Sequence, residues 1–559
     1  MKLERLAGLK KIFFVKGEKA VVFDAAFSVI MAFFTVFNQN AVEDHLFFGR
    51  FNMSRDTGLF IVYTILFYIA VRVIVAILNA RSKEEVCLEK RLPRLKLAIL
   101  MFLAWLPYLL IFLPGVANYD TVNQVNDFFD GVGPVPFGFV KGQETVNVFL
   151  NAHHPIVPTF IFSFFIWQGK VIGNESLGFL LYIVCQMAVG ALLISGILCD
   201  LYEKAGSTRG RTIVKIVRFF YMFMPFIPMY MICMLKNTLH SLIFILFIYV
   251  LYRYFLGRDE TPAGSWVVFF LTEAMLSLTL NTGIFVVVFT GIGILFLKDK
   301  NRVKFLAAML GCVILWFVIF PKVIYPTINV YPGGKQELYG TLFQQTGRLI
   351  RDNEEALSEE DKEIIDAILD YDTVKKAFTF NVTDPVKDTF KMNSTDEELN
   401  EYLKMWFRQG LKHPIIYLRA TFSICGYFFS PGAGIQIFSD IPKSDGIFAK
   451  IHNIAPSRFG EKAADLYFKI TIMPVIKWIF QTVLYAFWIP AYLYYIFVRR
   501  KKALGKKDEK AHELIILLPL FVSVLFLVVS PMNYSRYALC LIFSSPLAIA
   551  MLCSDYKKS

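Results

Sequence analysis

The chain is poor in charged residues. Only 18% of its 559 residues are Asp, Glu, Lys or Arg, whereas soluble domains usually carry about 25%. Hydrophobic residues make up 56% of the chain. They are concentrated in apolar blocks of about 20 residues, the length that crosses a hydrocarbon core. The net charge of +13 does not indicate nucleic-acid binding, because the basic residues form short clusters between these blocks. The composition therefore predicts an all-α polytopic membrane protein.

Motifs of common catalytic and metal sites are also missing. The sequence has no CxxC pair, zinc-ligand spacing, Walker motif, GxSxG or HExxH. Its eight cysteines lie mostly in apolar blocks, and we interpret them as packing residues. Glu273 is the only clear acid in the middle of an apolar block, which argues against an ion pump with a buried proton relay.

The order of apolar blocks and basic clusters predicts the topology. The predicted spans are 21–37, 58–79, 97–114, 177–199, 213–232, 238–256, 265–280, 283–298, 305–320, 470–497, 514–530 and 537–553. The basic clusters then share one side, which the positive-inside rule assigns to the cytoplasm. Both termini are expected there, and the long loops 115–176 and 321–469 are expected outside.

Four regions follow from this topology. They are an N-terminal two-span segment (1–96), a transmembrane core (97–320), an external helical domain (321–469) and a three-span segment (470–559). Pro155–Trp167 and Ile415–Phe429 are apolar but short. Because either one as a span would move basic clusters outside, we expect both to lie on or dip into the outer leaflet.

The first external loop offers two candidate groups. Asp120 follows the third span closely, where a carboxylate could meet a substrate carried by a lipid; the alternative is a helix cap, since Gln124 comes three residues after Thr121. The loop ends in His153 and His154. Adjacent histidines face one metal poorly on a helix, so hydrogen bonding to a substrate or a carboxylate is favoured.

Cations at two external turns are candidates for binding phosphate. Lys236 lies in the turn MICMLKNTLHSL, next to Asn237, and Arg536 lies in SPMNYSRYALC. Each could be an interfacial anchor or a phosphate ligand. The external segment FQQTGRLIRDN adds Gln344, Gln345 and Arg348, which share roughly one face of a helix.

The order of these motifs resembles the GT-C superfamily of membrane glycosyltransferases. Asp120 matches the acidic motif of the first loop in the protein mannosyltransferase-like branch, and His154-Pro155 matches a later HPP-type motif. The segments FQQTGR, TDPVK and Arg-Tyr look like those of a Firmicutes-type bacterial subgroup. The resemblance covers about 97–553. The usual acidic pair is a single Asp here, and Asn237 stands where an Asp is common.

The resemblance implies an inverting transferase in the bacterial cytoplasmic membrane with its active site outside. Its donor is a polyprenyl-phosphate sugar, and its acceptor is an envelope glycan, lipid or protein. Asp120 acts as general base, while Lys236, Arg536 and Arg348 hold the leaving phosphate and His153 or His154 orients one of these groups. The missing second acid favours a reaction without a divalent metal over one that uses it.

Two other functions fit the same hydropathy. A lipid or polysaccharide flippase would be expected to show paired halves and polar residues at the middle of the bilayer. A non-catalytic scaffold of envelope assembly would need no base at Asp120. The polar motifs at the external surface favour the transferase over both.

Overall fold

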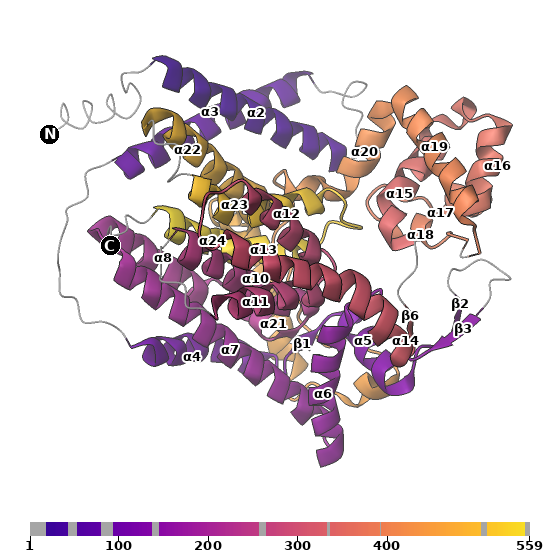
Figure 1. The fold of residues 1–559 in the computed structure, drawn as a ribbon, viewed down its shortest axis with the longest axis horizontal. Helices are drawn as coiled ribbons and strands as arrows, with labels where there is room; N and C mark the ends of the chain where they lie inside the picture. Colours follow the sequence, from indigo (N-terminus) through magenta and orange to yellow (C-terminus); the bar gives the residue numbers. More distant parts are fainter. Residues whose placement is uncertain are drawn as a thin grey trace.

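Helices dominate the computed structural model (Figure 1), which describes residues 18–42, 53–79, 93–136, 145–256, 264–331, 336–391, 393–504 and 511–553. Within these ranges seven helices are long and apolar enough to cross a membrane, and five further apolar helices are shorter. Strands within them form three two-stranded pairs. The chain is therefore an all-α membrane protein, as its composition predicts.

A bundle of helices forms the centre of the molecule. It comprises α4 (Arg94–Ile111), α7 (Glu175–Lys204), α8 (Thr208–Phe223), α10 (Lys236–Leu251), α11 (Ser265–Thr279), α12 (Gly283–Leu295), α13 (Arg302–Ile314), α22 (Ile489–Leu504), α23 (Ala511–Leu527) and α24 (Leu539–Cys553). The most enclosed helices are α24 and α10. In their most apolar stretches, 89% and 61% of the residues, respectively, are buried. Residues at the start of these two helices therefore lie deep inside the protein.

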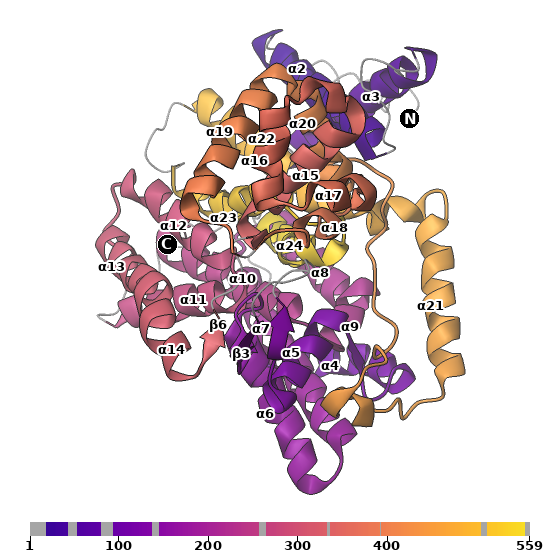
Figure 2. The same ribbon diagram turned by 90° about the vertical axis from the view of Figure 1, so that its right-hand side faces the viewer.

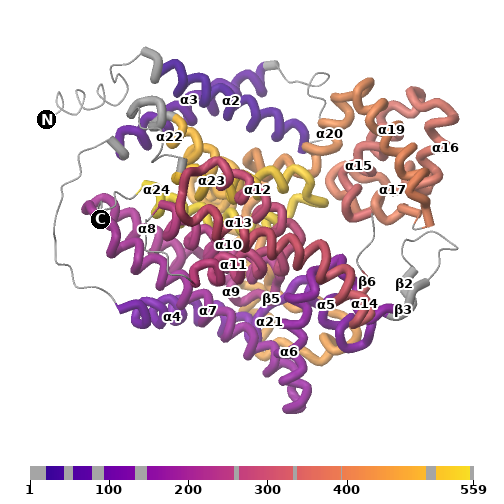
Figure 3. The backbone as a smooth tube through the Cα atoms, viewed as in Figure 1, coloured from indigo at the N-terminus to yellow at the C-terminus, as the bar shows by residue number. Residues whose placement is uncertain are grey.

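Helices α2 (Glu18–Val42) and α3 (Met53–Asn79) lie side by side along one edge of the molecule (Figures 1 and 3). A buried ion pair joins them, with 3.0 Å between Arg72 Nη1 and Asp24 Oδ2. The hydroxyl of Tyr495, on α22, donates to Asp24 Oδ1 at 2.6 Å. Because unpaired charge is costly in apolar surroundings, these contacts fix how the two helices dock on α22.

A group of helices with its own hydrophobic core stands at one end of the molecule (Figure 1). It consists of α15 (Gln336–Asn353), α16 (Glu359–Ile368), α17 (Tyr371–Ala377), α18 (Asp384–Lys387), α19 (Asp396–Lys412) and α20 (Pro414–Cys425), and we call it the outer domain. Capping boxes begin α16 and α19. Helix α20 contacts α2, where Phe422 packs edge-on against Phe34.

Short elements link the bundle to the loops. They are α5 (Tyr119–Asp130), α6 (Ile156–Ile172), α9 (Phe226–Met231), α14 (Tyr325–Thr327), α21 (Ser457–Ile472), β1 (Val116–Ala117), β2 (Gly133–Pro136), β3 (Thr145–Val148), β4 (Leu150–Asn151), β5 (Cys233–Met234) and β6 (Val330–Tyr331). Strands β1 and β5 pair in parallel, as do β4 and β6, whereas β2 and β3 pair antiparallel. Helix α21 runs along the edge of the molecule in Figure 2.

Two predicted spans differ from the helices observed. In place of one helix over 213–232, α8 ends at Phe223 and α9 begins at Phe226, because Pro225 cannot donate the hydrogen bond that would continue α8. In place of one helix over 470–497, α21 ends at Ile472 and the next apolar helix runs from Leu484 to Val498. Apolar content alone did not reveal these breaks.

Cysteine labelling can test the predicted sidedness. We expect Glu359→Cys, in the outer domain, to react with a membrane-impermeant maleimide on intact cells, because the Glu359 side chain is 86% exposed. Lys300→Cys, in the exposed turn before α13, should react only after the cells are opened. Both changes are made in a chain whose eight native cysteines are replaced. Labelling of Lys300→Cys on intact cells would contradict the topology.

Candidate functional site

A parallel strand pair brings two distant turns together. Val116 lies opposite Cys233, and Ala117 opposite Met234. Parallel strands run in the same direction, so the residues that follow each strand emerge at the same end. Asp120 therefore meets Lys236, although the two lie far apart in the sequence. The Thr121 hydroxyl donates to the Met234 carbonyl at 2.8 Å and holds the start of α5 against this pair.

Backbone geometry at Gly115 makes the close approach of β1 and β5 possible. Gly115 has a φ of +130°, which L-residues with a side chain rarely adopt. A Cβ atom there would lie 2.7 Å from Ile183 Cγ1 and 2.9 Å from the Ile232 carbonyl oxygen. The amide of Gln186, on α7, donates to the Met231 and Cys233 carbonyls at 2.9 Å each. These contacts hold the two turns in register.

The Asp120 carboxylate lies between two cations. Its Oδ2 atom is 3.2 Å from Lys236 Nζ and 3.0 Å from Arg536 Nη1. The Lys236 and Arg536 side chains are only 11% and 8% exposed. Burial raises the pKa of Asp120, but the charges of Lys236 and Arg536 outweigh that effect and hold the pKa well below its ordinary value. Asp120 is therefore ionised at neutral pH.

Asp120 is not the cap of its helix. The N-cap of α5 is Asn118, whose side-chain oxygen accepts from the Asp120 backbone N–H at 2.7 Å. The same oxygen accepts from Arg536 Nη1 at 2.8 Å. The capping alternative for Asp120 is therefore wrong, and its carboxylate is left for the two cations.

His154 completes this group, which we call the Asp120 cluster: Asp120, His154, Lys236 and Arg536. His154 Nδ1 is 2.7 Å from Lys236 Nζ. Since an ammonium only donates, this Nδ1 accepts, and neutral His154 carries its proton on Nε2. Burial lowers the pKa of His154 well below its ordinary value, and the Lys236 charge lowers it further. His154 is thus neutral at pH 7.

Unused donors remain in the Asp120 cluster. Arg536 Nη2 donates to the Tyr537 hydroxyl at 3.2 Å. Arg536 Nε is buried and has no hydrogen-bond partner in the part of the chain that the structure describes. Asp120 carries one negative charge, whereas Lys236 and Arg536 carry one positive charge each, so the three side chains together have one net positive charge. A buried, net-positive group with a spare N–H suits a singly charged anion.

A second parallel pair brings the outer domain to His153. Leu150 lies opposite Val330, and Asn151 opposite Tyr331, so the residues after β4 and β6 also converge. His153 Nδ1 is 3.4 Å from Glu337 Oε2, in the first turn of α15. Lys387 Nζ lies 3.1 Å from Glu337 and 2.9 Å from Asp384. Glu337 and Lys387 are absent from the candidate site residues predicted from the sequence: no local motif marks Glu337, and Lys387 ends the TDPVK segment, to which no role was assigned.

The other predicted site residues lie apart from the Asp120 cluster. Gln344 donates to the Thr379 carbonyl at 2.5 Å, and Gln345 donates to the Thr421 hydroxyl at 2.9 Å. Fully buried Arg348 pairs with Asp352 at 2.9 Å. These contacts hold all three side chains inside the outer domain, so assigning them to a phosphate site is a prediction that the geometry does not support.

The last of the predicted site residues is Asn237. Asn237 is buried in the first turn of α10, where its carbonyl accepts from the Ser241 hydroxyl at 2.6 Å. No hydrogen bond from its side chain to the Asp120 cluster is seen among the described residues. Within the same ranges, no three His, Cys, Asp or Glu side chains gather as metal ligands.

Comparison with known families identifies one relationship. The family of unknown function DUF6020 matches residues 10–559. No curated protein and no solved structure matches the chain.

The strand contact at Gly115 can be tested by adding one methyl group. We expect Gly115→Ala to lower stability by about 1–3 kcal/mol, because the backbone conformation is strained and two neighbouring atoms must move. Thermal unfolding of the purified protein in detergent measures the change. Gly196→Ala is the control, since a Cβ at Gly196, on α7, meets nothing within 4 Å. Equal stability of the two variants would contradict a structural role for the close approach.

Proposed function

The chain belongs to DUF6020, a family of unknown function, and we propose that it is an inverting glycosyltransferase of the GT-C type. It transfers a sugar from a polyprenyl-phosphate donor to an envelope acceptor on the external face of the bacterial cytoplasmic membrane. One observation carries the proposal: Asp120, His154, Lys236 and Arg536 meet at the ends of membrane helices. These four residues are among those on which the resemblance to GT-C enzymes rests.

The proposal includes twelve membrane crossings with both termini in the cytoplasm. Seven long apolar helices and four of the five shorter ones account for eleven crossings, because the fifth shorter helix is α6. In this arrangement α8 and α9 together cross once, and α6 lies in the outer leaflet. The Asp120 cluster then lies at the external surface, where a lipid-linked donor reaches it from the side.

The charge of the Asp120 cluster suits the proposed donor. A sugar joined to a polyprenyl phosphate is a phosphodiester and carries one negative charge, which matches the net positive charge of Asp120, Lys236 and Arg536. Arg536 Nε is a buried donor without a partner in the described chain, and it can accommodate a phosphate oxygen. Charge-assisted hydrogen bonds of this kind are among the strongest in proteins.

Donor binding also activates the base. While Asp120 is paired with both cations its pKa is low, and such a carboxylate takes up a proton poorly. A phosphate that draws Lys236 and Arg536 onto its own oxygens weakens those pairs and raises the Asp120 pKa toward the range that favours proton transfer. The base is therefore competent only when the donor is present.

The reaction is then a single displacement. The acceptor hydroxyl gives its proton to Asp120 as its oxygen bonds to the anomeric carbon, and the bond from that carbon to the phosphate oxygen breaks. Polyprenyl phosphate leaves with the bonding electrons, and Lys236 and Arg536 stabilise its added charge. His154, held by Lys236, keeps the ammonium directed at this position. The configuration at the anomeric carbon inverts.

Asp120→Asn tests the base. We expect kcat to fall by about 100-fold or more, because a positioned general base contributes at least that much. The assay is transfer from a polyprenyl-phosphate sugar at saturating donor. Asn also removes the counter-ion of two buried cations, so stability should fall too, and activity is compared per folded molecule.

Asp127→Asn, two turns further along α5, is the matched variant. Burial and the neighbouring Asp130 raise the Asp127 pKa to about 6, which makes this carboxyl the rival base. The proposal expects Asp127→Asn to transfer at close to the wild-type rate. A folded Asp120→Asn that keeps its activity while Asp127→Asn loses it would move the base to Asp127. Glu144, a further acid of this loop, lies outside the described residues.

Lys236 and Arg536 are tested through the donor. Lys236→Ala and Arg536→Ala should each weaken apparent donor affinity by about tenfold or more, since a hydrogen bond to a charged group contributes about 1.5–3 kcal/mol. Arg536→Lys should restore only part of the loss, because an ammonium lacks the guanidinium fork. Arg348→Lys, in the outer domain, is the control and should leave the apparent donor affinity unchanged. Unchanged donor dependence in both alanine variants would identify Lys236 and Arg536 as interfacial anchors.

A further inference from the structure

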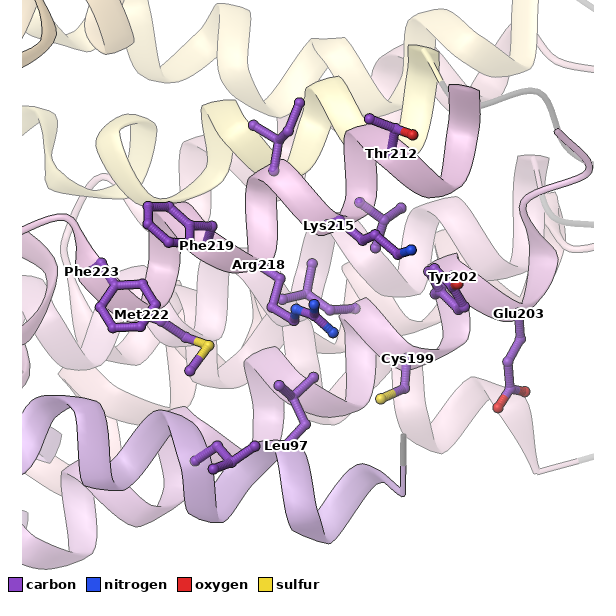
Figure 4. A pocket seen from close by; sticks show the side chains of 14 residues that line it. Leu97, Cys199, Tyr202, Glu203, Thr212, Lys215, Arg218, Phe219, Met222 and Phe223 are labelled. Carbon is purple, nitrogen blue, oxygen red and sulfur yellow. The ribbon is translucent and has the colours of Figure 1, made fainter. Parts of the chain in front are cut away.

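A groove of about 870 Å³ lies between α4, α7 and α8 and shares no lining residue with the Asp120 cluster (Figure 4). The start of α4 and the end of α7 form two sides, and one face of α8 forms the third. Eight of its lining residues lie on α8 between Thr212 and Phe223, and among them Thr212, Lys215, Phe219 and Met222 recur every three or four positions, as expected for one helix face. This is the end of the bundle where Arg94 and Lys204 lie.

Much of the groove is apolar and open to the surroundings. Ile216, Phe219 and Phe223 are 64%, 65% and 50% exposed, whereas Val217 and Tyr221, on the other face of α8, are buried against the bundle. Exposed side chains of this size on a membrane protein contact lipid, because apolar surface is expelled from water. Acyl chains of the surrounding bilayer therefore fill this part of the groove.

Two cations stand among these apolar side chains. Lys215 and Arg218 are three residues apart on α8 and point into the groove from the same face (Figure 4). No hydrogen bond or ion pair joins the Arg218 guanidinium to any residue within the described ranges. Lys215 lies 5.8 Å from the centre of the Tyr202 ring. Among the described residues that line the groove, Glu203 is the only acid and faces two cations.

We propose that this groove binds an anionic phospholipid. Its phosphate lies between Lys215 and Arg218, and an acyl chain follows the apolar wall past Leu97, Phe219 and Met222. A guanidinium in an apolar wall requires a counter-ion, and a lipid supplies that charge together with a chain that fits beside it. A free phosphate satisfies the cations but leaves the apolar wall uncovered. This site is independent of the proposed transferase activity.

Lipid retention by the purified full-length protein tests the proposal. The protein is equilibrated in mixed micelles with phosphatidylglycerol or phosphatidylcholine, and native mass spectrometry measures the bound lipid. We expect at least tenfold preference for phosphatidylglycerol. The double variant Lys215→Gln/Arg218→Gln should reduce the binding of phosphatidylglycerol by about 25-fold, since each basic residue near a membrane surface contributes about fivefold to the affinity.

Four comparisons make the result specific. Lys298→Gln with Lys300→Gln removes two exposed cations elsewhere and should leave lipid binding unchanged. Leu100→Trp keeps both groove cations but fills apolar space, and it should lose lipid. Inorganic phosphate should not displace the lipid at millimolar concentration. Lipid binding by Arg218→Lys should fall between that of wild type and that of the double variant. This single variant provides the test if the double variant does not fold.

Three outcomes would overturn the proposal. Equal losses in the groove variant and the Lys298/Lys300 control would mean that general surface charge attracts the lipid. Full displacement by inorganic phosphate, or unchanged binding in Leu100→Trp, would mean that the cations bind an anion without its acyl chain.

Discussion

Burial of Lys236 and Arg536 depends on the single negative charge of Asp120. Two cations that are almost fully enclosed cost several kcal/mol each without a counter-ion, and Asp120 lies about 3 Å from both. Their helices, α10 and α24, are the most enclosed of the bundle. Lys236 and Arg536, at the starts of these helices, can therefore come together only if α5 places the Asp120 carboxylate between them. Asn118, Tyr537 and His154 add hydrogen bonds to the same two cations.

The outer domain reaches the same place through a separate contact. The β4–β6 pair directs the start of α15 toward His153, and Glu337 links that histidine to Lys387. A second tie runs from Thr383, whose backbone N–H donates to the Pro531 carbonyl at 3.0 Å, five residues before Arg536. A movement of the outer domain would therefore act on both sides of the Asp120 cluster.

The basic residues of this chain serve more than one physical role. Basic residues at one end of the bundle predict the side that faces the cytoplasm. Arg72 differs because it forms an ion pair with Asp24 between α2 and α3, and Arg218 differs because it lines a groove made mostly of apolar side chains. Lys236 and Arg536 form a third class, paired with one carboxylate at the opposite end of the bundle. Charge counts alone do not separate these roles, since each depends on what surrounds the side chain.

The sequence by itself determined the membrane class and most of the apolar helices, and it singled out Asp120, His154, Lys236 and Arg536 as candidates. Each of these features is local: an apolar block has a length, and a charge beside it is conspicuous. Tertiary structure alone decided that these four residues meet, that Asn118 caps α5, and that Gln344, Gln345 and Arg348 belong to the core of the outer domain. It also added Glu337 and Lys387. The reason is that parallel pairing between strands of two residues each joins turns more than a hundred residues apart, and no pattern within either turn specifies its partner.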